Sequence, residues 1–337
     1  MLVGIAQEQG FLDINDPTSN YLGTGWTSCS TSQELAITVR HQLTMTTGLD
    51  DGVLPDNDCT DPACLQYLAA PGSRWAYHNA PYTLLRGVIQ AATGLNENQW
   101  TYQRVGAHIG MGGLWVLTGW NNVFFSRTRD MARYGLLLLN RGIWNSDTVL
   151  HDQSYFDAMT TSSQTLNESY GYLTWLNGQA SFMVPGVQLQ FPGSIVPNAP
   201  ADMFMALGKN DQKIHVVPSQ GLVVVRMGNA ADTTSLVPIV FDNELWARLN
   251  GLDCTTGIGR PPSTPSQAIH YDATMERVIM GDVWRDADVA VSDATGRLVF
   301  TAMAVGGVVD MRALPAGAYI LSGAKAGMPR RVFRFVK

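Results

Sequence analysis

The sequence has 337 residues, of which 45% are hydrophobic and 15% charged, a composition typical of a folded protein with a large core. Its net charge of −6 argues against nucleic acid as the main partner, because phosphate binding needs a basic surface. No apolar run comes near the roughly 20 residues needed to span a bilayer.

The N-terminal part of the sequence has mainly helical patterns. Residues 1–10 predict a helix that ends by Gly10, and an Asp/Pro turn follows. A second helix is expected after Thr38, which is a suitable N-cap residue, with Gly48 as the glycine beyond its end.

Two longer segments have the apolar spacing of amphipathic helices. In residues 79–94 one face carries Tyr82, Leu85, Ile89 and Ala92, and Gly94 ends the pattern. In residues 126–142 the apolar stripe consists of Met131, Tyr134, Leu138 and Leu139. The four consecutive leucines at 136–139 are expected to pack in the core.

The pattern changes after residue 200. Residues 202–208, 212–219 and 221–228 are short apolar runs separated by Gly and Pro, the last two rich in valine, and they predict strands. Residues 238–252 then predict a helix. Helices followed by strands and a final helix predict an α+β domain in which a sheet carries packed helices.

The C-terminal part of the sequence is different. Residues 253–270 are rich in Pro, Ser, Thr and Gly and predict a linker. Beyond it, residues 288–300 predict a hairpin with a Gly-containing turn, and residues 317–323 and 330–337 predict further strands. We therefore expect two domains, at 1–252 and 271–337, the second small and all-β.

Two of the four cysteines, Cys59 and Cys64, flank a short Asp/Pro stretch in an expected loop. This spacing permits a small disulfide, and two reduced thiols are an equal alternative on spacing alone. No Cys-x-x-Cys pair or His/Cys cluster indicates zinc, and no cofactor is expected.

Four segments, residues 36–52, 71–94, 124–145 and 212–229, resemble serine β-lactamase-related hydrolases and occur in the order seen there. That superfamily includes class C β-lactamases, DD-peptidases, esterases and nylon-oligomer hydrolases. The resemblance implies a β-lactamase/transpeptidase-like α+β fold, with an antiparallel sheet flanked by helices and a helical lobe. It also implies acyl transfer to a serine, followed by hydrolysis.

The second motif of this family, Tyr-x-Asn, is matched by Tyr77, His78 and Asn79. The resemblance implies that Tyr77 is the general base and that Asn79 holds the lysine or the substrate carbonyl. A phenol has a pKa of about 10, so Tyr77 needs a nearby cation to accept a serine proton at neutral pH. The alternative is that both residues merely cap the following helix.

The third motif of this family is matched only in part. Its best counterpart is residues 206–208, and Lys209 follows directly. The resemblance implies that backbone N–H groups near Gly208, Lys209 and Asn210 form half of an oxyanion hole. Lys209 either serves this site or lies in solvent at the end of a strand. Tyr172 and Trp175 could line a pocket or pack in the core.

The first motif, Ser-x-x-Lys, supplies the nucleophile and is missing. The lysines of the chain are Lys209, Lys213, Lys325 and Lys337, so no Ser-x-x-Lys motif can lie before residue 209. The formal match at residues 322–325 lies in the β-like C-terminal region, and we interpret it as coincidence. We expect Met1 to be an internal methionine of a longer protein, about three strands of a five-stranded sheet to be present, and the chain as given to be inactive.

The C-terminal domain resembles the sorting domain of the bacterial type IX secretion system, through residues 289–300 and 308–321 and the basic end of the chain. The usual Tyr-Pro-Asn-Pro opening is absent. The resemblance implies a secreted or cell-surface protein, with the secretion machinery as a partner. The oxidising compartment implies a bonded Cys59 and Cys64, with Cys29 and Cys254 as a weaker pair. A carbohydrate-binding sandwich is the alternative.

The sequence therefore predicts a secreted serine hydrolase that acts on a small-molecule or peptide ester or amide. A catalytically inactive surface binding protein that reuses the fold is the alternative. Tyr77 and Asn79 are expected to face one cleft, opposite Gly208 and Lys209, with the start of the first helix pointing into it.

Overall fold

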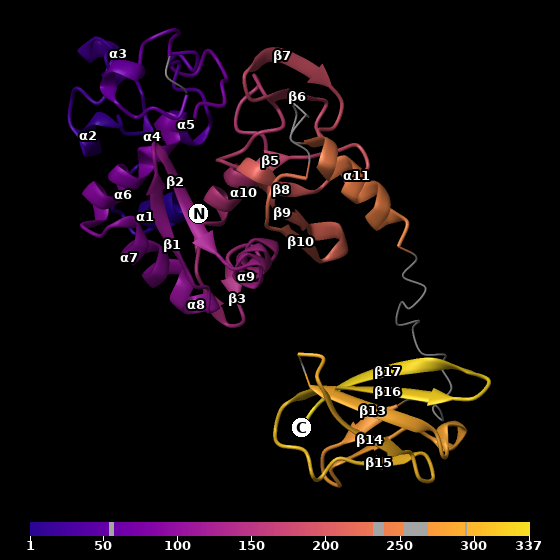
Figure 1. Cartoon of the computed structure of the whole chain (residues 1–337). Helices are drawn as coiled ribbons and strands as arrows, with labels where there is room; N and C mark the ends of the chain where they lie inside the picture. The colour runs from indigo at the N-terminus through magenta and orange to yellow at the C-terminus, as the bar shows by residue number, and fades with distance from the viewer. Residues whose placement is uncertain (54–56, 232–238, 253–268, 294) are drawn as a thin grey trace. The chain divides into compact units, whose positions relative to one another are not determined.

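The computed structural model describes residues 1–337 except 54–56, 232–238, 253–268 and 294. Contacts divide the chain into two compact units, Met1–Leu252 and Asp253–Lys337 (Figure 1). Within the described ranges, no helix is long and apolar enough to cross a membrane.

The first 160 residues are mainly helical. The helices are α1 (Leu2–Glu8), α2 (Ser19–Leu22), α3 (Thr31–Leu35), α4 (Val39–Leu43), α5 (Asn79–Thr83), α6 (Leu85–Thr93), α7 (Glu97–Thr101), α8 (Ala107–Ile109), α9 (Thr128–Leu139) and α10 (Gln153–Thr160). Several of them share one apolar core, which includes Ile5, Leu43, Val88 and Leu137. This core positions the segments that carry the candidate site.

The start of α4 is as predicted, but its end is not. The Thr38 hydroxyl accepts a hydrogen bond from the backbone N–H of His41 at 3.3 Å, so Thr38 caps the helix. The helix ends at Leu43, well before Gly48. Gly48 instead has φ +77° and lies so close to another loop that a Cβ would come within 2.1 Å of the Ala69 carbonyl oxygen. This close approach excludes a side chain at residue 48.

Residues 79–94 form two helices where one was predicted, because the chain breaks between α5 and α6 at Leu84. Gly94 ends α6 in the left-handed conformation, as predicted. In α9 the leucine run is not wholly core: Leu137 is fully buried, whereas Leu136 is 39% exposed. Consecutive residues of a helix point in different directions, so four in a row cannot share one buried face.

An antiparallel sheet follows the helices, as predicted, but it has four strands where about three were expected, in the order β10-β9-β8-β5. The strands are β5 (Trp175–Leu176), β8 (Phe204–Gly208), β9 (Gln212–Val217) and β10 (Leu222–Arg226). Three of them, β8, β9 and β10, are the predicted apolar runs. The two-residue strand β5 was not predicted, because two residues are too few to show the alternation of side chains that indicates a strand.

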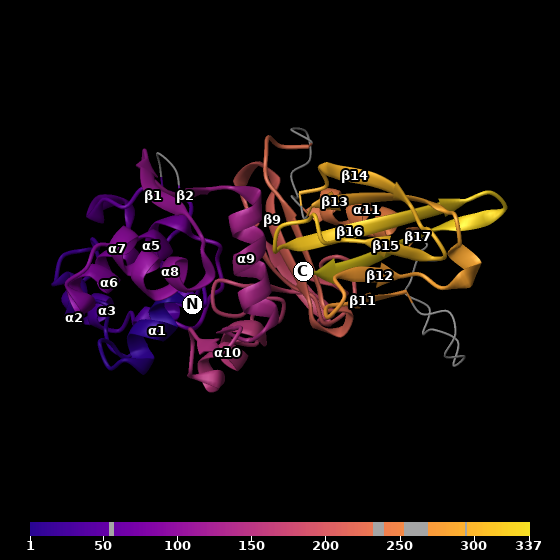
Figure 2. The ribbon, with the colours of Figure 1, turned by 90° about the horizontal axis from the view of Figure 1, so that it is seen from below.

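Helices cover both faces of this sheet. Figure 2 shows α9 between strand β9 and helix α8. Gly135 of α9 lies so close to the sheet that a Cβ would come within 2.5 Å of a Val223 methyl group. On the other face α11 (Ile239–Asn250) contacts β9 through Asp242. Alternation along β9 therefore directs Ile214 toward α9 and its two neighbours, Lys213 and His215, toward α11.

Three hairpins complete the first unit. They pair β1 (Gly113–Thr118) with β2 (Asn121–Ser126), β3 (Ile143–Trp144) with β4 (Asp147–Thr148), and β6 (Ser181–Val184) with β7 (Val187–Pro192). The β1–β2 turn brings Asn121 into the candidate site described below.

The second unit is built from two antiparallel sheets around its own apolar core. One sheet has the order β11-β12-β15 and the other β14-β13-β16-β17. The strands are β11 (His270–Asp272), β12 (Arg277–Ile279), β13 (Asp288–Asp293), β14 (Leu298–Met303), β15 (Val308–Asp310), β16 (Ala318–Lys325) and β17 (Met328–Val336). The predicted hairpin is β13–β14, and the predicted later strands are β16 and β17.

Candidate functional site

The Tyr-x-Asn segment lies at the start of α5. Asn79 is the first residue of this helix and is buried, and Tyr77 lies two residues earlier. The segment is held by Asn57, whose carbonyl accepts from Ala80 N–H at 3.0 Å and whose amide donates to the Tyr77 carbonyl at 3.3 Å. The loop that contains Asn57 therefore fixes the segment on which both predicted residues lie.

One carboxylate joins Asn79 to Lys209. Asp58 accepts hydrogen bonds from the Asn79 amide, from Asn121 Nδ2 at 2.7 Å and from Lys209 Nζ at 2.6 Å. The donors come from α5, from β2 and from the turn after β8. Asp58 and Asn121 were not predicted from the sequence. The structure thus brings together the second and third motif regions, which are far apart in the chain.

The charge of Asp58 is stabilised by these donors. Burial opposes ionisation of the carboxyl group, but the hydrogen bonds from Lys209, Asn79 and Asn121 outweigh it and lower the pKa of Asp58. The side chain of Asp58 is 7% exposed, and that of Lys209 is 68% exposed. The ion pair therefore has a buried anion and a cation at the surface.

The contribution of Asp58 to stability should depend on pH. A carboxyl group whose pKa is lowered by folding stabilises the folded state above its unfolded pKa, near 4, and loses this effect as pH falls through the folded pKa. We expect Asp58→Asn to cost about 1–3 kcal/mol at pH 7 and progressively less as the pH falls below about 4. Urea unfolding of both forms at several pH values measures this. A difference independent of pH would contradict the prediction.

Tyr77 lies in a cluster of aromatic rings. Its ring stacks on Trp175 at 5.5 Å between centroids and contacts Tyr82 and Tyr170 edge to face. Burial, with smaller contributions from Tyr82 and Asp58, raises the pKa of Tyr77 well above its usual range. Tyr77 is therefore a neutral phenol at pH 7 in this structure. A base role needs a further cation next to it.

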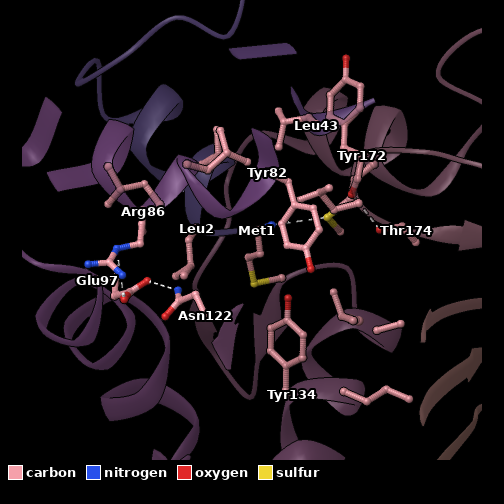
Figure 3. A pocket seen from close by; sticks show the side chains of 18 of the residues that line it. Met1, Leu2, Leu43, Tyr82, Arg86, Glu97, Asn122, Tyr134, Tyr172 and Thr174 are labelled. Carbon is pink, nitrogen blue, oxygen red and sulfur yellow. Dashed lines mark hydrogen bonds and ion pairs between the residues drawn. The ribbon is translucent and has the colours of Figure 1, made fainter. Parts of the chain in front are cut away.

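Tyr82 links this cluster to a cavity of about 270 Å³. Figure 3 shows the hydroxyl groups of Tyr82 and Tyr134 directed toward one space beside Met1, at the start of α1. Burial raises the pKa of both phenols to about 12. Tyr172 also lines the cavity, whereas Trp175 packs against Tyr77 instead. The lining is mostly apolar, so the cavity suits hydrocarbon or aromatic groups.

The end of β8 is a strained turn. Residues 209–211 form a short 3-10 turn, in which Asn210 and Asp211 have φ values of 58° and 59°. Such values cost non-glycine residues free energy, so neighbouring contacts must hold them. Arg226 donates to both of their carbonyls, at 3.2 and 2.9 Å, and Asp211 pairs with Lys213 at 3.3 Å. These contacts fix the position from which Lys209 reaches Asp58.

A buried polar cluster attaches α11 to β9. Asp242 accepts from Lys213 Nζ and from His215 Nε2, both at 2.7 Å. Trp246 Nε1–H donates to His215 Nδ1 at 3.1 Å, so the proton of a neutral His215 lies on Nε2. The side chains of Lys213, His215 and Asp242 are fully buried. The cluster stabilises the sheet directly behind the turn at residues 209–211.

The remaining predicted residues are placed as follows. Cys59 and Cys64 form a disulfide, with their Cα atoms 5.9 Å apart, directly after Asp58. Cys29 is a half-buried free cysteine, and Cys254 lies outside the described residues, so the structure does not show the weaker pair.

Among the described residues, no group of three His, Cys, Asp or Glu side chains is arranged to hold a metal ion.

The first unit is thus an α+β fold in which helices cover an antiparallel sheet, and Asn79 and Lys209 meet at one buried carboxylate. The sequence profile of the family described as Beta-lactamase matches residues 1–245. The chain therefore belongs to the β-lactamase family of hydrolases. No curated protein matches the chain.

Solved structures agree with this fold. A protein from Bacteroides dorei DSM 17855 assigned as a β-lactamase has a TM-score of 0.55 at 14% identity, over 74% of this chain and 80% of that one. A protein from Bacillus anthracis assigned as a 6-aminohexanoate-dimer hydrolase has a TM-score of 0.54 at 18% identity, over 75% and 72%. A family VIII carboxylesterase has a TM-score of 0.53 at 14% identity, over 73% and 79%. At these identities the likeness shows the fold alone.

Proposed function

We propose that the protein hydrolyses an ester or amide through an acyl-enzyme intermediate, with Tyr77, Asn79 and Lys209 as site residues. The observation that carries this proposal is the shared contact with Asp58, which places the Asn79 amide and the Lys209 ammonium together. An amide and a cation are groups that can bind a substrate carbonyl and stabilise the negative charge of its tetrahedral intermediate.

The nucleophile is the second part of the proposal. Within residues 1–337 the pattern Ser-x-x-Lys occurs once, at Ser322–Lys325. Those residues lie on β16 in the second unit, hydrogen-bonded to β13 and β17. We propose that the serine and its lysine lie outside residues 1–337. That lysine would be the cation that Tyr77 needs, because Lys209 is paired with Asp58.

One observation favours the inactive binding protein as a second candidate. The raised pKa of Tyr77, caused mainly by burial, leaves it unsuited to accept a proton in the structure as it stands. Hydrolysis of p-nitrophenyl butyrate by the protein purified from its native host separates the two candidates. Turnover supports the hydrolase, and binding of ligands without turnover supports the alternative.

The role of Lys209 can be tested in the same assay. We expect Lys209→Met to lower kcat/KM by at least about tenfold, because the site loses its ammonium group. Lys325→Met is the matched control, because Lys325 donates only to the backbone carbonyls of Val283 and Arg285 in the contacts that the structure describes. The control should keep its activity. Equal activity of both variants would remove Lys209 from the site.

We also propose that the second unit directs export. Its resemblance to a secretion sorting domain supports this proposal, as does its own apolar core, separate from that of the first unit. Fusion of residues 271–337 to a reporter that carries a signal peptide tests it in a host with the type IX machinery. Surface delivery is expected, and retention of the reporter in the periplasm would contradict the proposal.

A further inference from the structure

The donors of the candidate site are already hydrogen-bonded to a carboxylate of the chain itself. The Asn79 amide, the Asn121 amide and the Lys209 ammonium all donate to Asp58. An amide and an ammonium group beside a hydrolytic site are the groups that a substrate carboxylate would otherwise bind. Asp58 takes the place of such a carboxylate.

Asp58 is held firmly in this place. The preceding residue, Asn57, is hydrogen-bonded to Tyr77 and Ala80, and the following residue, Cys59, is 2% exposed and bonded to Cys64. The backbone of Asp58 is therefore fixed on both sides, and its carboxylate is held by Asn79, Asn121 and Lys209 among the described residues. Rotation of this side chain away from the site would break its hydrogen bonds to Asn79, Asn121 and Lys209.

The charged groups around the Tyr-x-Asn segment are negative in sum. Burial lowers the pKa of the neighbouring His78 to about 4, so this ring is neutral at pH 7, and it experiences the charges of Asp51, Arg74, Asp50 and Asp58. Asp51 is paired with Arg74 at 2.5 Å, and Asp58 with Lys209. These three carboxylates and two cations leave a net charge of −1 around the Tyr-x-Asn segment.

We propose that Asp58 determines substrate charge: the site accepts esters or amides that are uncharged next to the scissile bond and excludes those with a carboxylate there. This inference rests on the proposed function, because it names the substrate class of the same site. A substrate carboxylate would either lie beside Asp58 as a like charge or displace it. Displacement would leave Asp58 buried without its donors, which is unfavourable.

The test uses two ligands that differ only in whether this carboxylate is free or methylated, benzylpenicillin and its methyl ester. Isothermal titration measures their binding to the wild type, to Asp58→Asn and to the surface control Asp157→Asn. The wild type and the control should bind the methyl ester at least about tenfold more tightly than the acid. Asp58→Asn should reduce this preference to about threefold or less, through tighter binding of the acid.

A second variant gives the opposite change. Lys209→Met removes the cation that pairs with Asp58, so the preference for the neutral ester should increase. Far-UV circular dichroism and thermal unfolding verify that each variant is folded. Because Lys209→Met changes the preference in the other direction, the inference stays testable even if Asp58→Asn is unstable.

Three results would overturn the inference. They are wild-type binding of the acid as tight as that of the ester, an unchanged preference in Asp58→Asn, and no binding of either ligand by any form. Binding does not require turnover, so these results are distinct from failure of the proposed function. Turnover of p-nitrophenyl butyrate together with equal binding of acid and ester would remove only the inference about charge.

Discussion

Replacement of Lys213 by methionine is expected to lower the free energy of unfolding by about 3–5 kcal/mol, because it removes one partner of a buried ion pair. The side chains of Lys213 and Asp242 are both fully buried and lie 2.7 Å apart. Without the ammonium group, Asp242 keeps only His215 as a hydrogen-bond donor among the contacts that the structure describes. Urea unfolding followed by tryptophan fluorescence measures the loss.

Two further variants test the cause of this loss. In Lys213→Met/Asp242→Asn the Asp242 charge is removed as well, and only Asp211, whose side chain is 8% exposed, still loses its cation, so we expect recovery of about half of the lost stability. Asp157→Asn breaks an exposed pair with Arg141, whose two side chains are 59% and 48% exposed, and should cost no more than about 1 kcal/mol. A loss of less than 1 kcal/mol in the single variant would show that the buried pair does not stabilise the fold.

Tyr77→Phe is expected to have the largest effect on activity, a fall in kcat of about 100-fold or more. The variant keeps the ring that stacks on Trp175 and removes only the hydroxyl group that would transfer the proton. Stability should therefore change little. Stopped-flow or steady-state hydrolysis of p-nitrophenyl butyrate by the native-host form of the protein measures kcat.

Tyr102→Phe is the matched control, because Tyr102 is 63% exposed and lies outside the aromatic cluster. Its kcat should equal that of the wild type. Since burial raises the pKa of Tyr77, wild-type activity that needs the phenolate should also increase with pH through the neutral range. A kcat for Tyr77→Phe within threefold of the wild type would exclude Tyr77 as the base.

The sequence predicts those parts of the fold that have a regular pattern. The short apolar runs after residue 200 give β8, β9 and β10, and the helical spacing gives α9 and α11. The motif at Tyr77 and Asn79 and the lysine at residue 209 were found through family resemblance. The structure adds the Asp58 contact that links Asn79 and Lys209.

Other features of the structure are not indicated by the sequence around them. Asp58 lies in a loop, where most carboxylates are exposed to solvent, so its sequence position gives no sign that it is buried. Lys213 would be expected at the surface, and only the packing of α11 on β9 shows that it is buried. Gly48 was interpreted as a helix end because glycine favours that position, whereas its actual cause is contact between two loops. Each of these depends on residues distant in sequence.

The most direct test of the proposed hydrolase is to map the serine that reacts with a fluorophosphonate probe in the protein purified from its native host. We expect the label on a serine followed three residues later by lysine, in a segment outside residues 1–337. Tyr77→Phe should slow labelling by at least about tenfold. A label on a serine of residues 1–252, or no label on the folded protein, would contradict the proposal.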